Sequence, residues 1–348
     1  MFIFTIGLEY IIMKVPQFLL ITLTVLGVNG SAVAQEKNQL DFEYFYAQIN
    51  QDTLYKNLHI LASDEFEGRK TGELGQKKAA AFLVKQYQNY QITPAAGTEN
   101  YLQTVPSAFM KKLFSPLLND SENVIAYIRG SEFPEETLVI SAHYDHMGIE
   151  FGKTFYGADD NASGTVGVLE IARVFQEAVR HGFTPKRSLL FLHATGEEFG
   201  LHGSSYYVMH PSYSLENTFA NLNIDMIGRR SNDYIEQGNY IYLVGSDRLS
   251  TELHEVSESV NKQYSNLTLD YKYNVKGEPE QIYFRSDHYN FVRKGIPVIF
   301  YYNGPHADYH KATDTADKID YPLLQKRVQL IFATAWELIN RDERIKNN

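Results

Sequence analysis

The sequence predicts an α/β fold in three layers, with helices on both sides of a mostly parallel central sheet and a helical extension at the N-terminus. Two observations support this prediction. From residue 123 onward, short stretches rich in β-branched and apolar residues alternate with longer stretches of helical spacing. Two helical patterns also come before the first of these strands. Strands that alternate with helices pair in parallel, because each helix returns the chain to the same end of the sheet.

The predicted elements follow in chain order. Apolar residues at helical spacing predict two helices first, over residues 42–62 and 76–90. The predicted strands are 123–128, 137–142, 188–193, 219–225, 240–244 and 297–302. The helices between and after them are predicted from the turn at residue 157 to about residue 180, and over 201–210, 249–262 and 323–339. We see no repeat or linker, so the simplest division is a leader over 1–34, an N-terminal helical segment over 35–110 and a main domain over 111–348.

The N-terminus has the features of a secretory signal peptide. Lys14 follows Met13, an apolar run covers residues 18–28, and Ala32-Val33-Ala34 has the small-x-small pattern that precedes cleavage. The residues before Met13 suggest an upstream start codon or an over-long gene. The apolar run is short for a membrane span, and no later stretch resembles one. We therefore expect an exported, soluble protein, either periplasmic or secreted.

Charge and cysteine content exclude several functions. The formal net charge is −10, which argues against nucleic acid as a partner. The chain has no cysteine, which excludes disulfides, thiolate metal ligands and a lipid-modified N-terminal cysteine. The oligomeric state is not indicated by any of these features.

A turn of small and acidic residues over 157–164 (Gly-Ala-Asp-Asp-Asn-Ala-Ser-Gly) is the main candidate for chemistry. Asp159 and Asp160 lie directly before a helical pattern, where backbone N–H groups and the helix dipole favour negative charge. Taken alone, this arrangement is more often a helix N-cap in a solvated turn. The other polar residues at strand ends favour the metal-binding interpretation.

Those residues follow the predicted strands one after another, and ligands collect at the carboxyl ends of the strands in open α/β sheets. They are His143, Asp145 and His146, then Glu197 and Glu198, then Asp225, then His306 and His310. A mixed set of imidazoles and carboxylates suits Zn²⁺, with Mn²⁺ or Co²⁺ as substitutes. Five or more ligands exceed the needs of one tetrahedral ion, so we infer two metals, with one further carboxylate as general base.

Five segments resemble, in order, the signature segments of the M28 family of zinc aminopeptidases. The resemblance covers roughly residue 63 to the C-terminus, and Leu61-Ala-Ser-Asp-Glu-Phe-Glu-Gly-Arg69 is similar to the opening segment of many secreted bacterial members. The five segments are His143-x-Asp145, the turn 157–164, Gly196-Glu197-Glu198, Asn223-x-Asp225-Met226 and His310-x-x-x-Asp314-Thr315.

The resemblance implies two zinc ions per chain and a role for each site residue. It implies one zinc on His143 and Asp225, the other on Glu198 and His310, and Asp159 as the carboxylate that bridges them. It implies Glu197 as the general base toward the attacking water.

Further roles follow from the same resemblance. It implies that Asp145 and Asp314 accept hydrogen bonds from the two metal-binding histidines, and that the peptide bond after Asp159 is cis. Tyr283, three residues before Ser-Asp-His, is implied as a hydrogen-bond donor to the oxyanion; its alternative interpretation is a tyrosine at the edge of a strand or loop. His306 is an alternative to His310, and the Asp314-Thr315 pair favours His310.

The function that the resemblance implies is an aminopeptidase that removes N-terminal residues from peptides. The first alternative is a carboxypeptidase on the same scaffold, which needs a basic pocket; Arg229, Arg230 and Arg285 lie near the motifs. The second is a glutaminyl-cyclase-like transferase, which uses one zinc. The third is a non-catalytic binding protein, which the complete ligand set disfavours.

Overall fold

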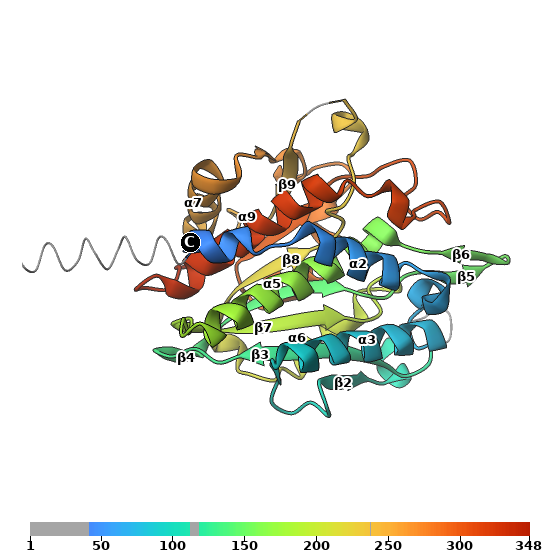
Figure 1. Ribbon diagram of the computed structural model, residues 1–348, viewed down its shortest axis with the longest axis horizontal. Coiled ribbons are helices and arrows are strands. Elements are labelled where there is room, and N and C mark those ends of the chain that lie inside the picture. The colour runs from blue at the N-terminus through green and yellow to red at the C-terminus, as the bar shows by residue number, and fades with distance from the viewer. Residues whose placement is uncertain (1–41, 112–117, 237) are drawn as a thin grey trace, which may run out of the picture. The chain divides into compact units, whose positions relative to one another are not determined.

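In the computed structural model, which describes residues 42–111, 118–236 and 238–348, a sheet of nine strands forms the centre (Figure 1). Residues 45–348 make one compact unit. The order of the strands is β1-β3-β7-β4-β8-β11-β9-β10, and β2 pairs with β3 outside this path. The neighbours β7, β4, β8 and β11 run parallel to one another. The predicted fold class is therefore confirmed.

The strands agree with the sequence prediction in the centre of the sheet. Their bounds are β1 (Thr93–Pro94), β2 (Leu102–Val105), β3 (Ser121–Ile128), β4 (Phe133–His143), β7 (Arg187–Ala194), β8 (Thr218–Ile224), β9 (Tyr240–Val244), β10 (Thr268–Asp270) and β11 (Val298–Tyr302). Every residue of β7, β8, β9 and β11 is buried, as expected for strands covered on both faces. A separate hairpin of β5 (Gly148–Glu150) and β6 (Lys153–Phe155) follows β4.

Helices cover the sheet on both faces. Three long helices pack on one face: α3 (Leu74–Tyr90), α5 (Gly164–Arg180) and α9 (Tyr321–Asn340), with α5 and α9 crossing the near side of the sheet in Figure 1. The helix α2 (Gln51–Leu61) packs on α5 and α9, and α7 (Thr251–Val260) packs on α9. The short helices α6 (His202–Met209) and α8 (His288–Val292) contact each other and the sheet strands. The helix α4 (Ser107–Met110) packs on α6.

The apolar spacing of α5 explains its central place. Val166, Leu169 and Phe175 recur at helical intervals and are fully buried, so this helix presents a continuous apolar face to the sheet. Burial of such side chains contributes about 1.5–3 kcal/mol each, which makes the sheet-facing side of α5 a large part of the core. The helix begins directly after the turn 157–164, so packing of α5 fixes where that turn lies.

The N-terminal part differs from the prediction in two ways. The predicted helix 42–62 is interrupted, because Ile49 and Asn50 lie outside helical structure and Asn50 caps α2 by accepting the N–H of Thr53. The segment 35–110 also contributes β1 and β2 to the main sheet, so it is not purely helical. The predicted division at residue 110 stays a prediction.

Two points concern membranes and export. Among the described residues, none of the helices is both long enough and apolar enough to cross a lipid bilayer. The predicted signal peptide, residues 1–34, lies outside the described residues.

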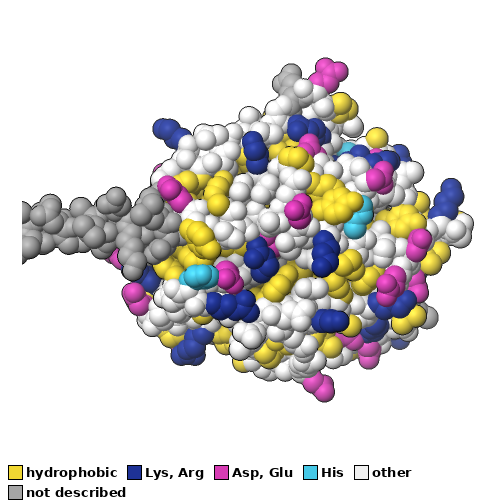
Figure 2. Space-filling model, in the orientation of Figure 1, with side chains coloured by type: hydrophobic (Ala, Val, Ile, Leu, Met, Phe, Trp, Pro, Cys, Tyr) yellow, Lys and Arg dark blue, Asp and Glu magenta, His cyan; other side chains and the backbone are white. Residues whose placement is uncertain are grey.

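On the face shown in Figure 2, basic and acidic side chains are interspersed with apolar ones.

Candidate metal centre

The parallel strands bring the predicted site residues together at one end of the sheet. The strand β4 ends at His143, β7 leads to Glu197 and Glu198, and β8 is followed directly by Asp225. The loop after β11 supplies His310. Because β4, β7, β8 and β11 are parallel neighbours, their carboxyl ends meet at the same edge, as the sequence predicts.

The first group of ligand atoms is formed by His143, Asp160 and Asp225. The Nε2 atom of His143 lies 3.3 Å from Oδ1 of Asp160 and 3.3 Å from Oδ1 of Asp225. All three residues are buried. Burial opposes protonation of His143, but the carboxylates of Asp225 and Glu197 outweigh it, so the pKa of His143 is raised well above its usual value.

The second group is centred on Asp160 and Glu198. The Nε2 atom of His310 lies 3.1 Å from Oδ2 of Asp160 and 3.1 Å from Oε2 of Glu198. His146 is the imidazole whose ligand atom groups with those of Asp160 and Glu198, with its Nδ1 atom 2.6 Å from Oε1 of Glu198 but 4.0 Å from Oδ2 of Asp160. Since His310 is equidistant from both carboxylates, it is the better candidate ligand, and the short contact of His146 suits a residue that orients Glu198.

Asp160, and not Asp159, is the carboxylate shared by the two groups. Its Oδ1 atom faces His143 and its Oδ2 atom faces His310. The carboxylate of Asp159 turns the other way, where its Oδ1 accepts the N–H of Gly228 at 2.6 Å. The prediction that Asp159 bridges the metals is therefore wrong by one position. The reason is the geometry of the turn, which sends two adjacent side chains to opposite sides.

Two other details of this turn correct the sequence analysis. The cis peptide bond joins Asp160 to Asn161, one bond later than predicted. Asp314 accepts hydrogen bonds from the backbone N–H groups of Asp159 and Asp160, at 2.9 and 3.1 Å, rather than from His310. Asp314 thus holds the turn in place.

Asp145 supports both His143 and the loop that carries the glutamates. Its backbone oxygen lies 3.2 Å from Nδ1 of His143, and its Oδ1 atom lies 3.7 Å from the same nitrogen. Oδ1 also accepts the N–H of Glu197, and Oδ2 accepts the hydroxyl of Thr71 at 2.7 Å. An acceptor at Nδ1 keeps Nε2 free for a metal, and here the backbone oxygen of Asp145 is that acceptor; the role predicted for the Asp145 side chain stays a prediction.

Glu197 belongs to neither ligand group, although its Oε2 atom lies 4.0 Å from Nε2 of His143. Burial raises the pKa of Glu197 well above its usual value; His143 acts in the opposite direction, and Asp225 adds to the rise. Cations at the cluster would lower this pKa again. Among the four carboxylates of this cluster, Glu197 is thus the one that lies outside both ligand groups.

The structure does not bring Tyr283 to the cluster. Its ring lies under Arg248, with Cζ of Arg248 3.8 Å from the ring centre, and it lines a different cavity. The tyrosine that sequence analysis missed is Tyr309, which stacks on His310 with ring centres 3.9 Å apart. Burial raises the pKa of the Tyr309 hydroxyl, and the nearby carboxylates of Asp160 and Glu198 raise it further. A neutral phenol beside the cluster is a hydrogen-bond donor. The sequence signal that could have identified Tyr309 is its position directly before His310, a predicted ligand.

A chain of buried hydrogen bonds fixes Asp225. The hydroxyl of Ser286 donates to Oδ2 of Asp225 at 2.6 Å, and it accepts from Nδ2 of Asn223 at 2.9 Å. Oδ1 of Asn223 accepts the hydroxyl of Ser141 at 2.8 Å. The segment that starts with Tyr283 in the sequence thus contributes Ser286 to the site. Such outer partners commonly orient ligands and tune affinity.

Arg69 ties the N-terminal segment to the loops of the site. Its guanidinium is fully buried and donates to four backbone oxygens: those of Leu61 at 2.8 Å, Tyr144 at 2.8 Å, Tyr156 at 2.7 Å and Gly157 at 2.9 Å. Two of these carbonyls lie next to predicted site residues. The segment Leu61–Arg69 therefore fixes the site loops and supplies no ligand of its own.

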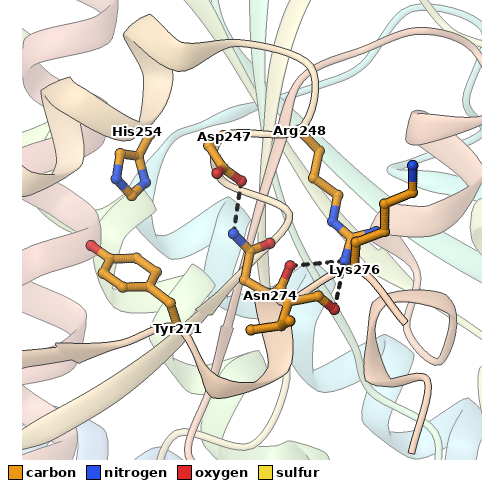
Figure 3. Close-up of a pocket in the computed structure, with 7 residues that line it drawn as sticks. Asp247, Arg248, His254, Tyr271, Asn274 and Lys276 are labelled. Carbon is orange, nitrogen blue, oxygen red and sulfur yellow. Dashed lines mark hydrogen bonds between the residues drawn. The ribbon is translucent and has the colours of Figure 1, made fainter. Parts of the chain in front are cut away.

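A cavity of about 230 Å³ opens onto the cluster. Its walls include Asp160, Glu197, Asp225, Met226, Glu280, Ile282, Arg285, Phe300, Tyr302, Pro305, Tyr309 and His310. A larger cavity of about 650 Å³ lies elsewhere and is lined by Asp247, Arg248, His254, Tyr271, Asn274, Val275 and Lys276 (Figure 3). In Figure 3, Asp247 and Arg248 are already bonded to the segment around Asn274. None of the ligand groups lines this cavity, so the smaller one is the candidate for chemistry.

The cluster fits bound zinc in its chemistry and in its unmet contacts. Four carboxylates and three imidazoles converge, and a buried set of like charges is costly unless cations balance it. The Nε2 atom of His310 has no hydrogen-bond partner among the described residues, although two carboxylate oxygens lie 3.1 Å away. Ligand atoms that converge on one point without hydrogen-bonding one another suit a bound cation. Nitrogen and oxygen ligands without sulfur are those of a zinc centre in a hydrolase.

Fold and cluster together define an α/β protein with a candidate metal centre at the carboxyl ends of its parallel strands. The sequence profile of peptidase family M28 matches residues 123–335. The chain belongs to peptidase family M28, and the resemblance stated above is confirmed.

Curated relatives agree with this assignment. A probable zinc metalloprotease of Pyricularia oryzae is 24% identical over 77% of this chain and 59% of its own length. The aminopeptidase YwaD of Bacillus subtilis is 28% identical over 65% of this chain and 46% of its own length. A probable glutamate carboxypeptidase of Arabidopsis thaliana, AMP1, is 28% identical over 62% of this chain and 30% of its own length. The chain thus spans about three fifths or less of the length of these relatives.

Solved structures show the same fold. The LapA aminopeptidase of Legionella pneumophila superposes with a TM-score of 0.69 at 20% identity, over 88% of this chain and 76% of that one. The zinc aminopeptidase BSAP of Bacillus subtilis gives a TM-score of 0.64 at 18% identity, over 86% of this chain and 98% of that one. A glutaminyl cyclase of Porphyromonas gingivalis also gives 0.64 at 18% identity, over 82% and 97%. Since peptidases and a cyclase share this fold, its presence does not select one activity.

Proposed function

We propose that this protein is an exported zinc aminopeptidase with two zinc ions per chain. The observation that carries the proposal is that Asp160 is shared between two groups of ligands, while Glu197 beside them belongs to neither. His143 and Asp225 would complete the site of one ion, and Glu198 and His310 that of the other.

The chemistry divides between the ions and the side chains. Two zinc ions held here would polarise the scissile carbonyl and lower the pKa of water. Glu197 accepts a proton from the attacking water on a carboxylate oxygen and passes it to the departing amine. The hydroxyl of Tyr309 donates a hydrogen bond to the oxyanion. Tyr309 thus takes the role that the sequence analysis predicts for Tyr283.

The cavity supports recognition of a single terminal residue. Part of its wall is apolar, from buried Met226, Ile282 and Phe300, and its volume of about 230 Å³ suits one side chain. Glu280 and Arg285 are exposed charges that also line it. In the proposed aminopeptidase, Glu280 attracts the free α-ammonium group of the peptide.

One observation favours a second candidate, a carboxypeptidase. Of the three arginines considered in the sequence, Arg229 is paired with Asp308 and Arg230 with Asp320. Arg285 is the one that lines the cavity, where its guanidinium suits a terminal carboxylate. The same substrate panel tests both candidates.

Export is proposed from the leader alone. The run of Lys14, apolar residues 18–28 and Ala32-Val33-Ala34 has the order of a signal peptide. Expression of the full chain in a bacterial host, followed by N-terminal sequencing of the periplasmic protein, tests this. We expect a mature N-terminus at Gln35, and an uncleaved chain in the cytoplasm would contradict export.

Hydrolysis of a panel of free and N-blocked substrates tests the proposed activity. Aminoacyl-p-nitroanilides with a free amine should be cleaved, and o-phenanthroline should stop the reaction. Glu197→Gln should lower kcat by about 10²–10⁴-fold, since it removes a general base without changing its shape. The matched control is Glu216→Gln, an exposed glutamate of the short 3-10 helix before β8, which should behave as wild type. Cleavage of N-blocked peptides from the C-terminal end would instead support the carboxypeptidase.

A further inference from the structure

His306 and Asp159, both left without a role by the proposed chemistry, contact each other next to residues of the candidate metal centre. The Nε2 atom of His306 lies 3.0 Å from Oδ2 of Asp159, and both side chains are buried. The Nδ1 atom of His306 accepts the N–H of Asp308 at 3.2 Å. Because Nδ1 is an acceptor, the ring proton is on Nε2, the nitrogen that lies next to Oδ2 of Asp159, although the pair does not have the geometry of a hydrogen bond.

Asp159 and the segment that carries His306 are each held by further hydrogen bonds or ion pairs. Oδ1 of Asp159 accepts the N–H of Gly228 at 2.6 Å and the hydroxyl of Ser163 at 3.0 Å. The carboxylate of Asp308 lies 2.9 Å from a guanidinium nitrogen of Arg229 and 2.8 Å from Nζ of Lys318. The contact therefore joins two anchored segments.

These two segments carry different ligands of the same proposed ion. Asp159 precedes Asp160 in the turn, and His306 lies four residues before His310 in the loop after β11. The N–H of Tyr309 donates to the backbone oxygen of His306 at 3.1 Å, so the loop between the two histidines is itself a hydrogen-bonded turn. A movement of His306 would thus move His310 relative to Asp160.

We propose that His306, acting through Asp159, is a positioning residue that sets the separation of Asp160 and His310 and so the affinity of the second zinc site. This inference rests on the proposed zinc centre. The first site shares Asp160 but depends less on the contact, because its other two ligands, His143 and Asp225, come from the ends of β4 and β8. Loss of a residue that holds a metal ligand in place typically lowers metal affinity about 10–100-fold. Here we expect the affinity of the second zinc site to fall and that of the first to stay as in wild type.

Zinc titration against a chromophoric chelator tests the proposal with His306→Gln, Asp159→Asn and the double variant. Wild type should bind two zinc ions tightly. Each single variant should bind one ion as wild type does and the other at least about 10-fold more weakly. The double variant should be no worse than the weaker single variant, because both changes break one contact. His210→Gln, an exposed histidine at the end of α6, is the matched control.

Thermal unfolding of the zinc-free proteins accompanies the titration. An unchanged Tm shows that the fold is intact, and Asp159→Asn serves if His306→Gln does not fold. Two zinc ions bound with wild-type affinity by folded single variants, or additive losses in the double variant, would overturn the proposal, as would a wild type that binds no zinc. A wild type that binds two zinc ions but cleaves no peptide would refute the proposed activity and leave the positioning role intact.

Discussion

Replacement of Arg69 by methionine should destabilise the protein more than most single substitutions. The guanidinium is buried and donates to four backbone oxygens, and methionine fills similar space without any donor. A buried carbonyl that loses its partner costs about 1–3 kcal/mol. We use the low end of this range, because relaxation of the structure and entry of water offset part of each loss. Four losses of about 1 kcal/mol each then lower the free energy of unfolding by about 4 kcal/mol.

Urea unfolding of the zinc-free protein, followed by the fluorescence of its single tryptophan, Trp336, measures this change. Omitting zinc keeps a change in metal binding from contributing to the free energy of unfolding. The matched control is Arg180→Met, since Arg180 is partly exposed and donates to one backbone oxygen, that of Tyr90, at 2.6 Å. We expect a loss of about 1 kcal/mol or less there. A loss below about 1 kcal/mol for Arg69→Met would refute the view that Arg69 holds the site loops together.

Three further predictions concern pH, metal affinity and the oxyanion. Burial lowers the pKa of His193 to about 3, so the unfolded chain binds a proton that the folded chain excludes. The contribution of His193 to the free energy of unfolding should therefore fall by about 1.4 kcal/mol per unit as pH drops below about 6.5. Urea unfolding of wild type and His193→Gln from pH 7 to 5 should show this difference between the two slopes. Ser286→Ala removes the hydrogen bond to Asp225 and should weaken one zinc site about 10–100-fold in a chelator titration, with unchanged affinity contradicting that role. Tyr309→Phe should lower kcat about 10²–10³-fold, whereas Tyr283→Phe should not, and the reverse pattern would restore the original assignment.

The fold was predictable because its signals are periodic and repeated. The strands β4, β7, β8 and β11 are buried along their central stretches and appear in the sequence as short apolar runs. Their parallel pairing then places the residues that follow each strand at one edge, which is why His143 and Asp225 could be grouped from sequence. The short β1, β2 and β10 were missed, since strands of two to four residues carry little periodicity.

The details of the site depended on directions that spacing does not determine. Asp159 and Asp160 are adjacent acids, and only the dihedral angles of the turn select which of them faces the cluster. Tyr283 lies three residues from Ser286 and yet points under Arg248, because a short loop can turn successive side chains in different directions. Sequence spacing therefore located the site but did not assign the bridging carboxylate or the tyrosine.

The proposed two-zinc centre depends most on Asp160, which belongs to both ligand groups. Zinc content per chain, measured by inductively coupled plasma mass spectrometry after dialysis at a fixed low concentration of free zinc, tests this directly. We predict two zinc ions in wild type, one each in His143→Ala and His310→Ala, and fewer than one in Asp160→Ala. Two zinc ions retained by Asp160→Ala, or none bound by wild type, would contradict the account.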